Sequence, residues 1–119
     1  MSETPEPSIF TRIVRREIPA TILAETDRVI AFADIAPKAP VHILVVPKTE
    51  QYANVVELAA GDPSLLAEIV ATAGELAREH SDGDFRLVFN TGEAAGQTVF
   101  HVHAHVLSGD LQEGSLATS

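Results

Sequence analysis

Three histidines at every second position dominate the last third of the sequence. His101, His103 and His105 alternate with small apolar residues in the run HVHAHVL. A period of two is typical of a β-strand, whose successive side chains point to opposite faces of a sheet. We therefore predict a strand over residues 99–107 that carries all three imidazoles on one face, with neighbouring imidazoles about 7 Å apart along the strand.

The rest of the sequence predicts an α+β domain. Apolar runs indicate four further strands at residues 21–25, 28–34, 41–46 and 85–89, and the nearly continuous third run indicates a central strand. Ser8 is expected to cap a short helix that begins at Ile9. Asp62 and Pro63 are expected to begin a long amphipathic helix that ends near His80. Because short turns join most strands, we predict a five-stranded antiparallel meander sheet with the long helix packed on one face.

A length of 119 residues is that of one domain. Residues 1–7 are expected to form a disordered lead, residues 8–108 the folded domain, and residues 109–119 a loosely held tail. A single sheet with one covering layer leaves strand edges and apolar surface exposed. We therefore expect a homodimer, with the long helix or an edge strand at the interface.

The composition excludes several classes of protein. The net charge of -9 argues against a surface that binds duplex nucleic acid, and the absence of cysteine excludes disulfides, thiolate nucleophiles and cysteine-based zinc sites. No apolar run approaches the roughly 20 residues that a membrane span needs. The start MSETPEPS has neither a basic nor an apolar region typical of a signal peptide, so we expect a cytoplasmic protein.

The histidine strand allows three kinds of role. Together with His42 it could bind zinc, but no acidic residue alternates with the histidines, and the outer two lie about 13 Å apart at the backbone. We therefore expect no metal. The histidines could be structural, although valine or threonine would pack better in a strand. Nucleophilic catalysis fits best, because a neutral imidazole attacks phosphorus readily and the preceding loop, residues 92–98, offers backbone N–H groups to a phosphate.

The segment GQTVFHVHAHVL resembles the signature of the histidine triad (HIT) family. Upstream pieces agree with this resemblance, which runs from Ile9 to Leu107 and is closest to the small Hint-like and bacterial HIT branches. These pieces are Ile9-Phe10, Ile18-Pro19, the run VIAFADIAPKAPVHILVVPK and Asn90. The resemblance implies a HIT-like α+β fold and a nucleotide-binding hydrolase.

The resemblance implies catalytic roles for five residues. His103 would be the nucleophile that accepts the nucleoside monophosphate, and His105 would contact the phosphate and help to transfer protons. His101 would orient the cluster together with His42. Thr98 would lie near the bridging atom and help to protonate the leaving group.

The resemblance also implies a set of nucleotide-binding residues. Asp34 would accept the ribose hydroxyls, with Phe32 and Ile35 beside the base or sugar. The phosphate region would be contacted by Asn90, Gly96, Gln97, Thr98, His103 and His105, and the base pocket would be walled by Ile9, Phe10 and Ile18.

The implied substrates are purine nucleotides of the AMP type, such as nucleoside phosphoramidates, and no cofactor is implied. Family members that act as transferases carry glutamine in place of the third histidine, so the retained His105 favours hydrolysis. Three alternatives stay open: a diadenosine-polyphosphate hydrolase or nucleotidyl transferase of the same fold, a non-catalytic AMP-binding protein, and a zinc protein. The tail SGDLQEGSLATS lacks the Trp-Pro segment common in Hint-like proteins, which leaves the leaving group open.

Overall fold

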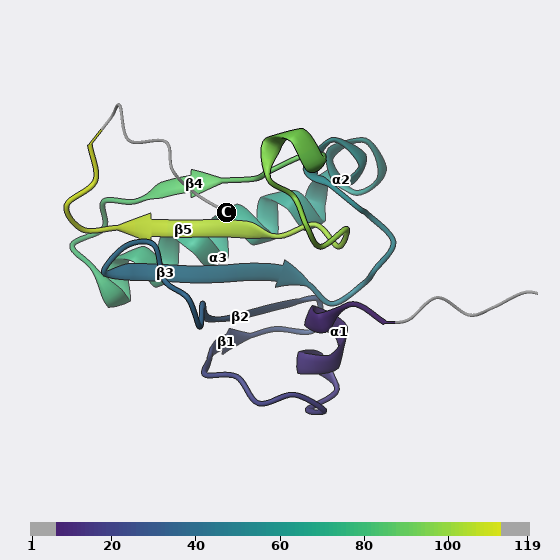
Figure 1. The fold of residues 1–119 in the computed structure, drawn as a ribbon, viewed down its shortest axis with the longest axis horizontal. Helices are drawn as coiled ribbons and strands as arrows, with labels where there is room; N and C mark the ends of the chain where they lie inside the picture. Colours follow the sequence, from purple (N-terminus) through teal and green to yellow (C-terminus); the bar gives the residue numbers. More distant parts are fainter. Residues whose placement is uncertain (1–6, 113–119) are drawn as a thin grey trace, which may run out of the picture.

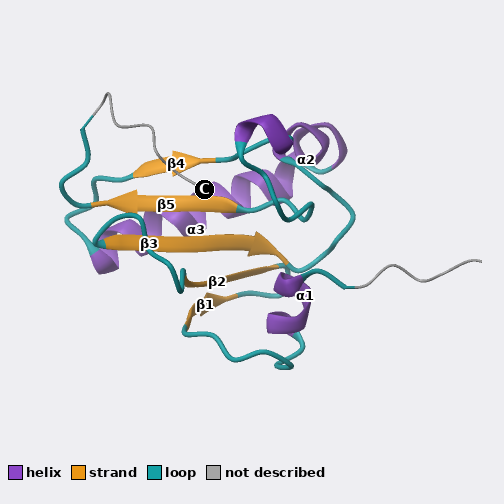
Figure 2. Ribbon diagram, in the orientation of Figure 1, coloured by secondary structure: helices purple, strands orange, loops and turns teal. Residues whose placement is uncertain are grey.

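The computed structural model describes residues 7–112, so most of the predicted lead and tail lies outside the described residues. It has the predicted α+β architecture, a five-stranded antiparallel sheet with helices (Figures 1 and 2). The elements in chain order are α1 (Ile9–Val14), β1 (Ile22–Glu25), β2 (Val29–Ala33), β3 (Val41–Pro47), α2 (Val55–Gly61), α3 (Pro63–His80), β4 (Arg86–Val88), a 3-10 turn (Glu93–Ala95) and β5 (Ala104–Ser108).

The strand order is β1-β2-β3-β5-β4, and every neighbouring pair is antiparallel. The first three strands form the predicted meander. The last two depart from it, because β5 lies between β3 and β4. The predicted central strand is confirmed, since β3 pairs with β2 on one side and with the histidine strand β5 on the other.

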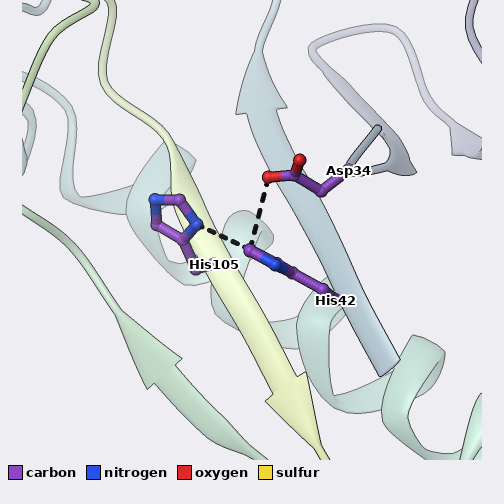
Figure 3. Close-up of side chains that lie close together, drawn as sticks. All are labelled: Asp34, His42 and His105. Atoms are coloured by element: carbon purple, nitrogen blue, oxygen red, sulfur yellow. Dashed lines mark hydrogen bonds and ion pairs between the residues drawn. The ribbon is translucent and has the colours of Figure 1, made fainter. Parts of the chain in front are cut away.

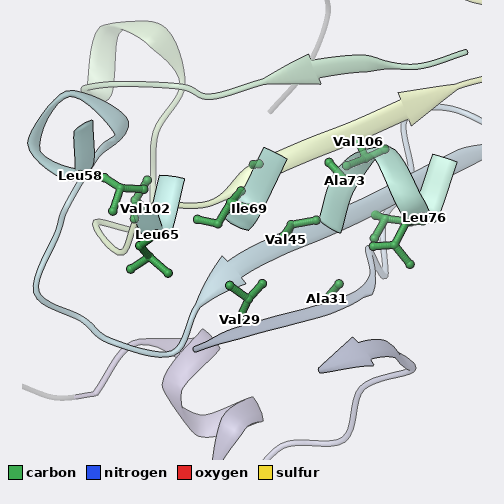
Figure 4. Close-up of a cluster of buried hydrophobic side chains, with 12 residues drawn as sticks. Val29, Ala31, Val45, Leu58, Leu65, Ile69, Ala73, Leu76, Val102 and Val106 are labelled. Carbon is green, nitrogen blue, oxygen red and sulfur yellow. The ribbon is translucent and has the colours of Figure 1, made fainter. Parts of the chain in front are cut away.

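Helix α3 covers one face of the sheet, and the main core lies between the helix and that face (Figure 4). It begins as predicted, with Pro63 in its first turn and the Asp62 carboxylate accepting a hydrogen bond from the Leu65 N–H. Its buried stripe consists of Leu65, Ile69, Thr72, Ala73, Leu76 and Ala77, whereas Val70 is 43% exposed. Within the described part of the chain, no helix is long and apolar enough to cross a membrane.

Helix α1 covers part of the opposite face. The predicted cap is present, since the Ser8 hydroxyl oxygen accepts a hydrogen bond from the Thr11 N–H at 3.1 Å. Phe10 and Ile13 of this helix are buried against the sheet. Their partners in this second apolar cluster include Ile30, Phe32, Leu44 and Val46.

The histidine strand is shorter than predicted, because β5 begins at Ala104 and not at residue 99. Its ladder with β3 ends at the pair Val45–Ala104, although β3 itself continues beside β2 to Pro47. The residues before Ala104 therefore leave the ladder. Instead the Val102 N–H donates to the Tyr52 carbonyl at 3.0 Å.

Helix α2 was not predicted from the sequence, although its first turn carries a recognisable signal. Asn54 caps the helix by accepting a hydrogen bond from the Glu57 N–H at 3.0 Å. The Glu57 carboxylate reaches back to the Ala53 N–H at 3.0 Å. This reciprocal arrangement is close to a capping box, whose spacing of polar and acidic residues is visible in the sequence.

Candidate active site

The alternation of HVHAHVL places the three imidazoles on the sheet face that α1 covers, as predicted. The apolar residues between them belong to the core beneath α3 on the other face. His101 and His105 are 1% and 2% exposed, whereas His103 lies between buried and exposed. The ring centroids of His103 and His105 are 5.1 Å apart. The cluster therefore presents His103 as its most accessible ring.

Both ring nitrogens of His101 have partners, and they fix its tautomer. A carbonyl only accepts hydrogen bonds, so the contact of 2.7 Å between Nε2 and the Pro47 carbonyl oxygen places the proton on Nε2. Nδ1 then accepts a hydrogen bond from the Ser8 hydroxyl at 2.6 Å.

The tautomer of His103 follows from the same rule. Its Nδ1 lies 2.9 Å from the His101 carbonyl oxygen and therefore carries a proton, which leaves a lone pair on Nε2 in the neutral ring. A backbone carbonyl bonded to one nitrogen is the arrangement that makes the other nitrogen of a histidine available as a nucleophile or ligand.

His42 and His105 form a second, directly bonded pair (Figure 3). The Lys38 N–H donates to His42 Nδ1 at 2.9 Å, so the neutral His42 ring carries its proton on Nε2. That Nε2–H lies 2.9 Å from His105 Nδ1 and 3.4 Å from an Asp34 carboxylate oxygen. His105 therefore carries its own proton on Nε2.

His42 was predicted to orient the cluster together with His101. In the structure the two act at different places: His101 fixes His103, and His42 fixes His105.

Burial lowers the pKa of all four histidines. Desolvation is the largest cause in each case, and it lowers the pKa of His105 to about 4, with the neighbouring His103 and His42 acting in the same direction. A nearby Asp34 carboxylate opposes the shift at His42, His103 and His105. At neutral pH the cluster is therefore uncharged, which is the state that a histidine nucleophile needs.

Within residues 7–112, two buried donors have no hydrogen-bond partner: Nε2 of His105 and Nδ2 of Asn90. Asn90 lies two residues beyond Val88, which pairs with His105 across the β4–β5 ladder. Leaving such donors unpaired costs free energy, and in native proteins such groups are rare and call for an explanation, such as a catalytic role or an ordered water or ion. A phosphate oxygen is an acceptor that would satisfy both.

The loop before the histidines is held by Gln97. The side chain of Gln97 is buried, donates to the carbonyls of Ala53 and Val99 at 2.6 and 3.0 Å, and accepts from the Gly92 N–H at 2.9 Å. It was predicted to contact phosphate through its backbone or side chain, but its donors already have acceptors: both side-chain N–H bonds go to carbonyls, and the backbone N–H donates to the Gly92 carbonyl at 3.1 Å. Gly96 has a φ of 95°, which residues with a Cβ rarely adopt. Thr98 is exposed.

Replacing Gln97 by alanine is expected to loosen this loop. Three hydrogen bonds would be lost, so we expect the free energy of unfolding to fall by about 1–3 kcal/mol and any loop-dependent turnover to fall about tenfold. Urea unfolding and steady-state kinetics measure the two effects. Gln51→Ala is the matched control, since Gln51 is exposed. Equal stability and activity of the two variants would contradict this role.

The residues predicted to wall a base pocket are placed unevenly. The Phe10 ring lies 4.9 Å from the His103 ring and 5.8 Å from that of Phe32, measured between centroids. Ile18 packs against the same cluster. In contrast, Ile9 is 45% exposed and Ile35 is 93% exposed. Phe10 therefore packs directly against His103, and Phe32 and Ile18 belong to the same apolar cluster.

Asp34, His42 and His105 offer ligand atoms within 4.8 Å of one another, a grouping that could hold a metal ion. No acidic residue alternates with the histidines in the sequence, but Asp34 approaches His42 from the end of β2. The hydrogen bonds argue against a metal there. His42 Nε2 carries the proton, because the Lys38 N–H occupies Nδ1, and a protonated nitrogen cannot be a ligand.

The chain is similar to known proteins over most of its length. The family model of the HIT domain matches residues 15–112. An uncharacterized HIT-like protein of Synechococcus elongatus is 49% identical over 105 residues, covering 87% of this chain and 91% of that protein. A purine nucleoside phosphoramidase of Escherichia coli is 38% identical over 106 residues, covering 87% of this chain and 88% of that protein.

A solved structure has the same fold. A HIT family hydrolase from Clostridium thermocellum superimposes with a TM-score of 0.87 at 43% identity, and the match covers 95% of this chain and all of that one. The family match spans the sheet, α3 and the histidine cluster, which is the part of the chain that carries the site geometry. This chain belongs to the HIT family, and it has the features of a HIT family hydrolase.

Proposed function

We propose that this protein hydrolyses nucleoside phosphoramidates, or related nucleotide conjugates, at the α-phosphorus through a nucleotidyl intermediate on His103. The observation that carries the proposal is the tautomer of His103. Its Nδ1–H is bonded to the His101 carbonyl at 2.9 Å, so Nε2 keeps a lone pair on the most accessible ring of the cluster. The Escherichia coli relative named a purine nucleoside phosphoramidase supports the choice of substrate.

In the first half of the reaction, His103 Nε2 attacks the α-phosphorus. A new P–N bond to the imidazole forms as the P–N bond to the leaving amine breaks. The amine leaves with a proton that reaches it through the Thr98 hydroxyl or the His105 Nε2–H. The group that donates is reprotonated from solvent in the same transfer, because neither a hydroxyl nor a neutral imidazole can remain deprotonated at neutral pH.

In the second half, water attacks the phosphorus of the nucleotidyl-histidine. The P–N bond to His103 breaks and returns its electron pair to Nε2, the water passes one proton to solvent, and the nucleoside monophosphate is released. The unpaired donors His105 Nε2 and Asn90 Nδ2 support this proposal, since both could donate to the phosphoryl oxygens on which charge develops.

The nucleoside part of the substrate would lie between the apolar cluster that contains Phe10 and the end of β2. Phe10, Phe32 and Ile18 supply an apolar wall for the base. Asp34 follows β2, and its side chain is 18% exposed, so a carboxylate oxygen is available to ribose hydroxyls. Purine preference is proposed from the relative's name alone.

Side-by-side kinetics on four substrates test this function. We expect an adenosine 5′-phosphoramidate to give the highest kcat/KM, ahead of a guanosine phosphoramidate, a diadenosine polyphosphate and a sugar nucleotide. A preference of tenfold or more for the dinucleotide, which is about 1.4 kcal/mol of transition-state discrimination, would favour the polyphosphate hydrolase instead. No turnover of any substrate, with AMP still bound, would favour the non-catalytic alternative.

The homodimer stays a proposal. Strand β4 is an unpaired edge of the sheet within the described residues, and Phe85 beside it is 38% exposed. On α3, Val70 is 43% exposed on the outer surface. Sedimentation at micromolar concentration should give twice the monomer mass, and a monomer mass would refute the dimer.

A further inference from the structure

We propose that Ser8 and Glu50 are positioning residues that hold α1 against His101 and so fix the orientation and protonation state of the His101–His103 pair. This inference rests on the proposed function for its consequence in catalysis. Its structural part concerns a polar network that the catalytic steps do not use. The network consists of Ser8, Thr11, Glu50 and His101, and we call it the α1 lock.

The Ser8 hydroxyl lies at the centre of the α1 lock. It donates to His101 Nδ1 at 2.6 Å and accepts from the Thr11 N–H. The same hydroxyl is therefore both the cap of α1 and the partner of the His101 ring. The His101 ring is 1% exposed, so water is excluded from this contact. Because Nε2 of the same ring donates to the Pro47 carbonyl, only a donor suits Nδ1.

Glu50, in the segment that follows β3, supplies the carboxylate of the α1 lock. One of its carboxylate oxygens accepts from the Ser8 N–H at 2.7 Å and from the Thr11 hydroxyl at 2.5 Å. Two hydrogen bonds lower the pKa of Glu50. The bond from the Thr11 hydroxyl has the largest effect, followed by the bond from the Ser8 N–H. The carboxylate is therefore ionised at neutral pH and binds the start of α1, where exposed N–H groups favour an anion.

Helix α1 needs such a tether because it has only six residues, and isolated helices of that length do not persist in water. Its Phe10 ring packs edge-on against both His101 and His103, at centroid distances of 5.6 and 4.9 Å. The position of α1 therefore determines how Phe10 covers the His103 ring.

The α1 lock also reaches His103 through the backbone. The ring of His101 is fixed at both nitrogens, and its carbonyl accepts the His103 Nδ1–H. Without the Ser8 hydroxyl, Nδ1 of His101 would be buried beside the Glu50 carboxylate with no donor. Protonation of that nitrogen would then relieve the unpaired lone pair. A charged His101 next to His103 would disturb the neutral pair.

The test compares Ser8→Ala, Ser8→Thr and Glu50→Ala in the full-length chain. We expect kcat on the adenosine phosphoramidate to fall about tenfold in Ser8→Ala with KM within about twofold, as misplacement of a reacting group predicts. Ser8→Thr restores the hydroxyl and should restore kcat. Glu50→Ala should lose kcat in the same direction. Asp62→Ala is the control, because it removes the cap of α3 on the other face of the sheet.

Nitrogen-15 NMR of the histidine rings provides a readout that loss of stability alone would not change. The wild type should show neutral His101 protonated on Nε2, and Ser8→Ala should show mixed tautomers or a protonated ring at the same pH. Asp62→Ala should retain the wild-type ring signals.

Unchanged ring signals in Ser8→Ala, or a kcat no lower than that of Asp62→Ala, would overturn the proposal. Wild-type kcat in Glu50→Ala would overturn the part assigned to Glu50. If the wild type turned over none of the substrates, the proposed function would fail. The ring signals would still decide whether Ser8 positions His101.

Discussion

Replacing His103 by alanine is expected to lower turnover of an adenosine phosphoramidate by about 10⁴-fold or more while leaving the fold intact. The variant loses the only atom that the proposed mechanism bonds to phosphorus, and losses of this size are typical when a nucleophile is removed. The ring is partly exposed and its one ring hydrogen bond goes to a backbone carbonyl, so the core should tolerate its removal. Single-turnover kinetics and circular dichroism measure the two properties.

His80→Ala is the matched control for this variant. His80 is an exposed histidine in the last turn of α3 and has no place in the proposed mechanism. Its substitution should leave turnover within about twofold of the wild type, as is usual for a surface change. Turnover by His103→Ala at the rate of the His80→Ala control would rule out a nucleophilic His103.

Acidification from pH 7 to pH 4 is expected to cost this protein about 3 kcal/mol of unfolding free energy at His105 alone. An unfolded histidine titrates near its ordinary pKa of 6.5, whereas burial lowers the pKa of His105 to about 4 in the folded protein. Between these values the unfolded chain binds the proton and the folded chain does not. Stability therefore falls as the pH drops below 6.5 and levels off below about 4.

The three other buried histidines act in the same direction, because burial lowers their pKa values too. Urea unfolding of the wild type and of His105→Gln across this pH range isolates the contribution of His105. The glutamine variant cannot titrate, so its stability should fall less steeply between pH 6.5 and 4. Parallel pH profiles for the two proteins would show that His105 is not buried in its neutral form.

Much of this fold was predictable because its signals are local. The Asp62-Pro63 start of α3, the Ser8 cap of α1 and the alternation in HVHAHVL each depend on neighbours a few residues apart, and all three are present in the structure. The late start of β5 at Ala104 was not anticipated, because the preceding Val102 N–H bonds to the Tyr52 carbonyl, which is distant in the sequence.

The parts of the site that the sequence did not reveal are long-range contacts. Nothing in the spacing of residues indicates that the Ser8 hydroxyl lies against His101, or that Asp34 approaches His42. Likewise, one of the three bonds of Gln97 joins it to Ala53, 44 residues earlier in the chain. Residue types and periods identified the histidine face, but the tautomers that give each ring its role required the positions of Pro47, Lys38 and Ser8.

The central claim is tested most directly by mass spectrometry of enzyme that is quenched rapidly, without acid, during turnover of an adenosine phosphoramidate. We predict a protein species heavier by one adenylyl group, with the modification located on His103 by peptide fragmentation and absent from His103→Ala. An enzyme that turns over the substrate while carrying no nucleotide on His103, or carrying it on another residue, would contradict the account.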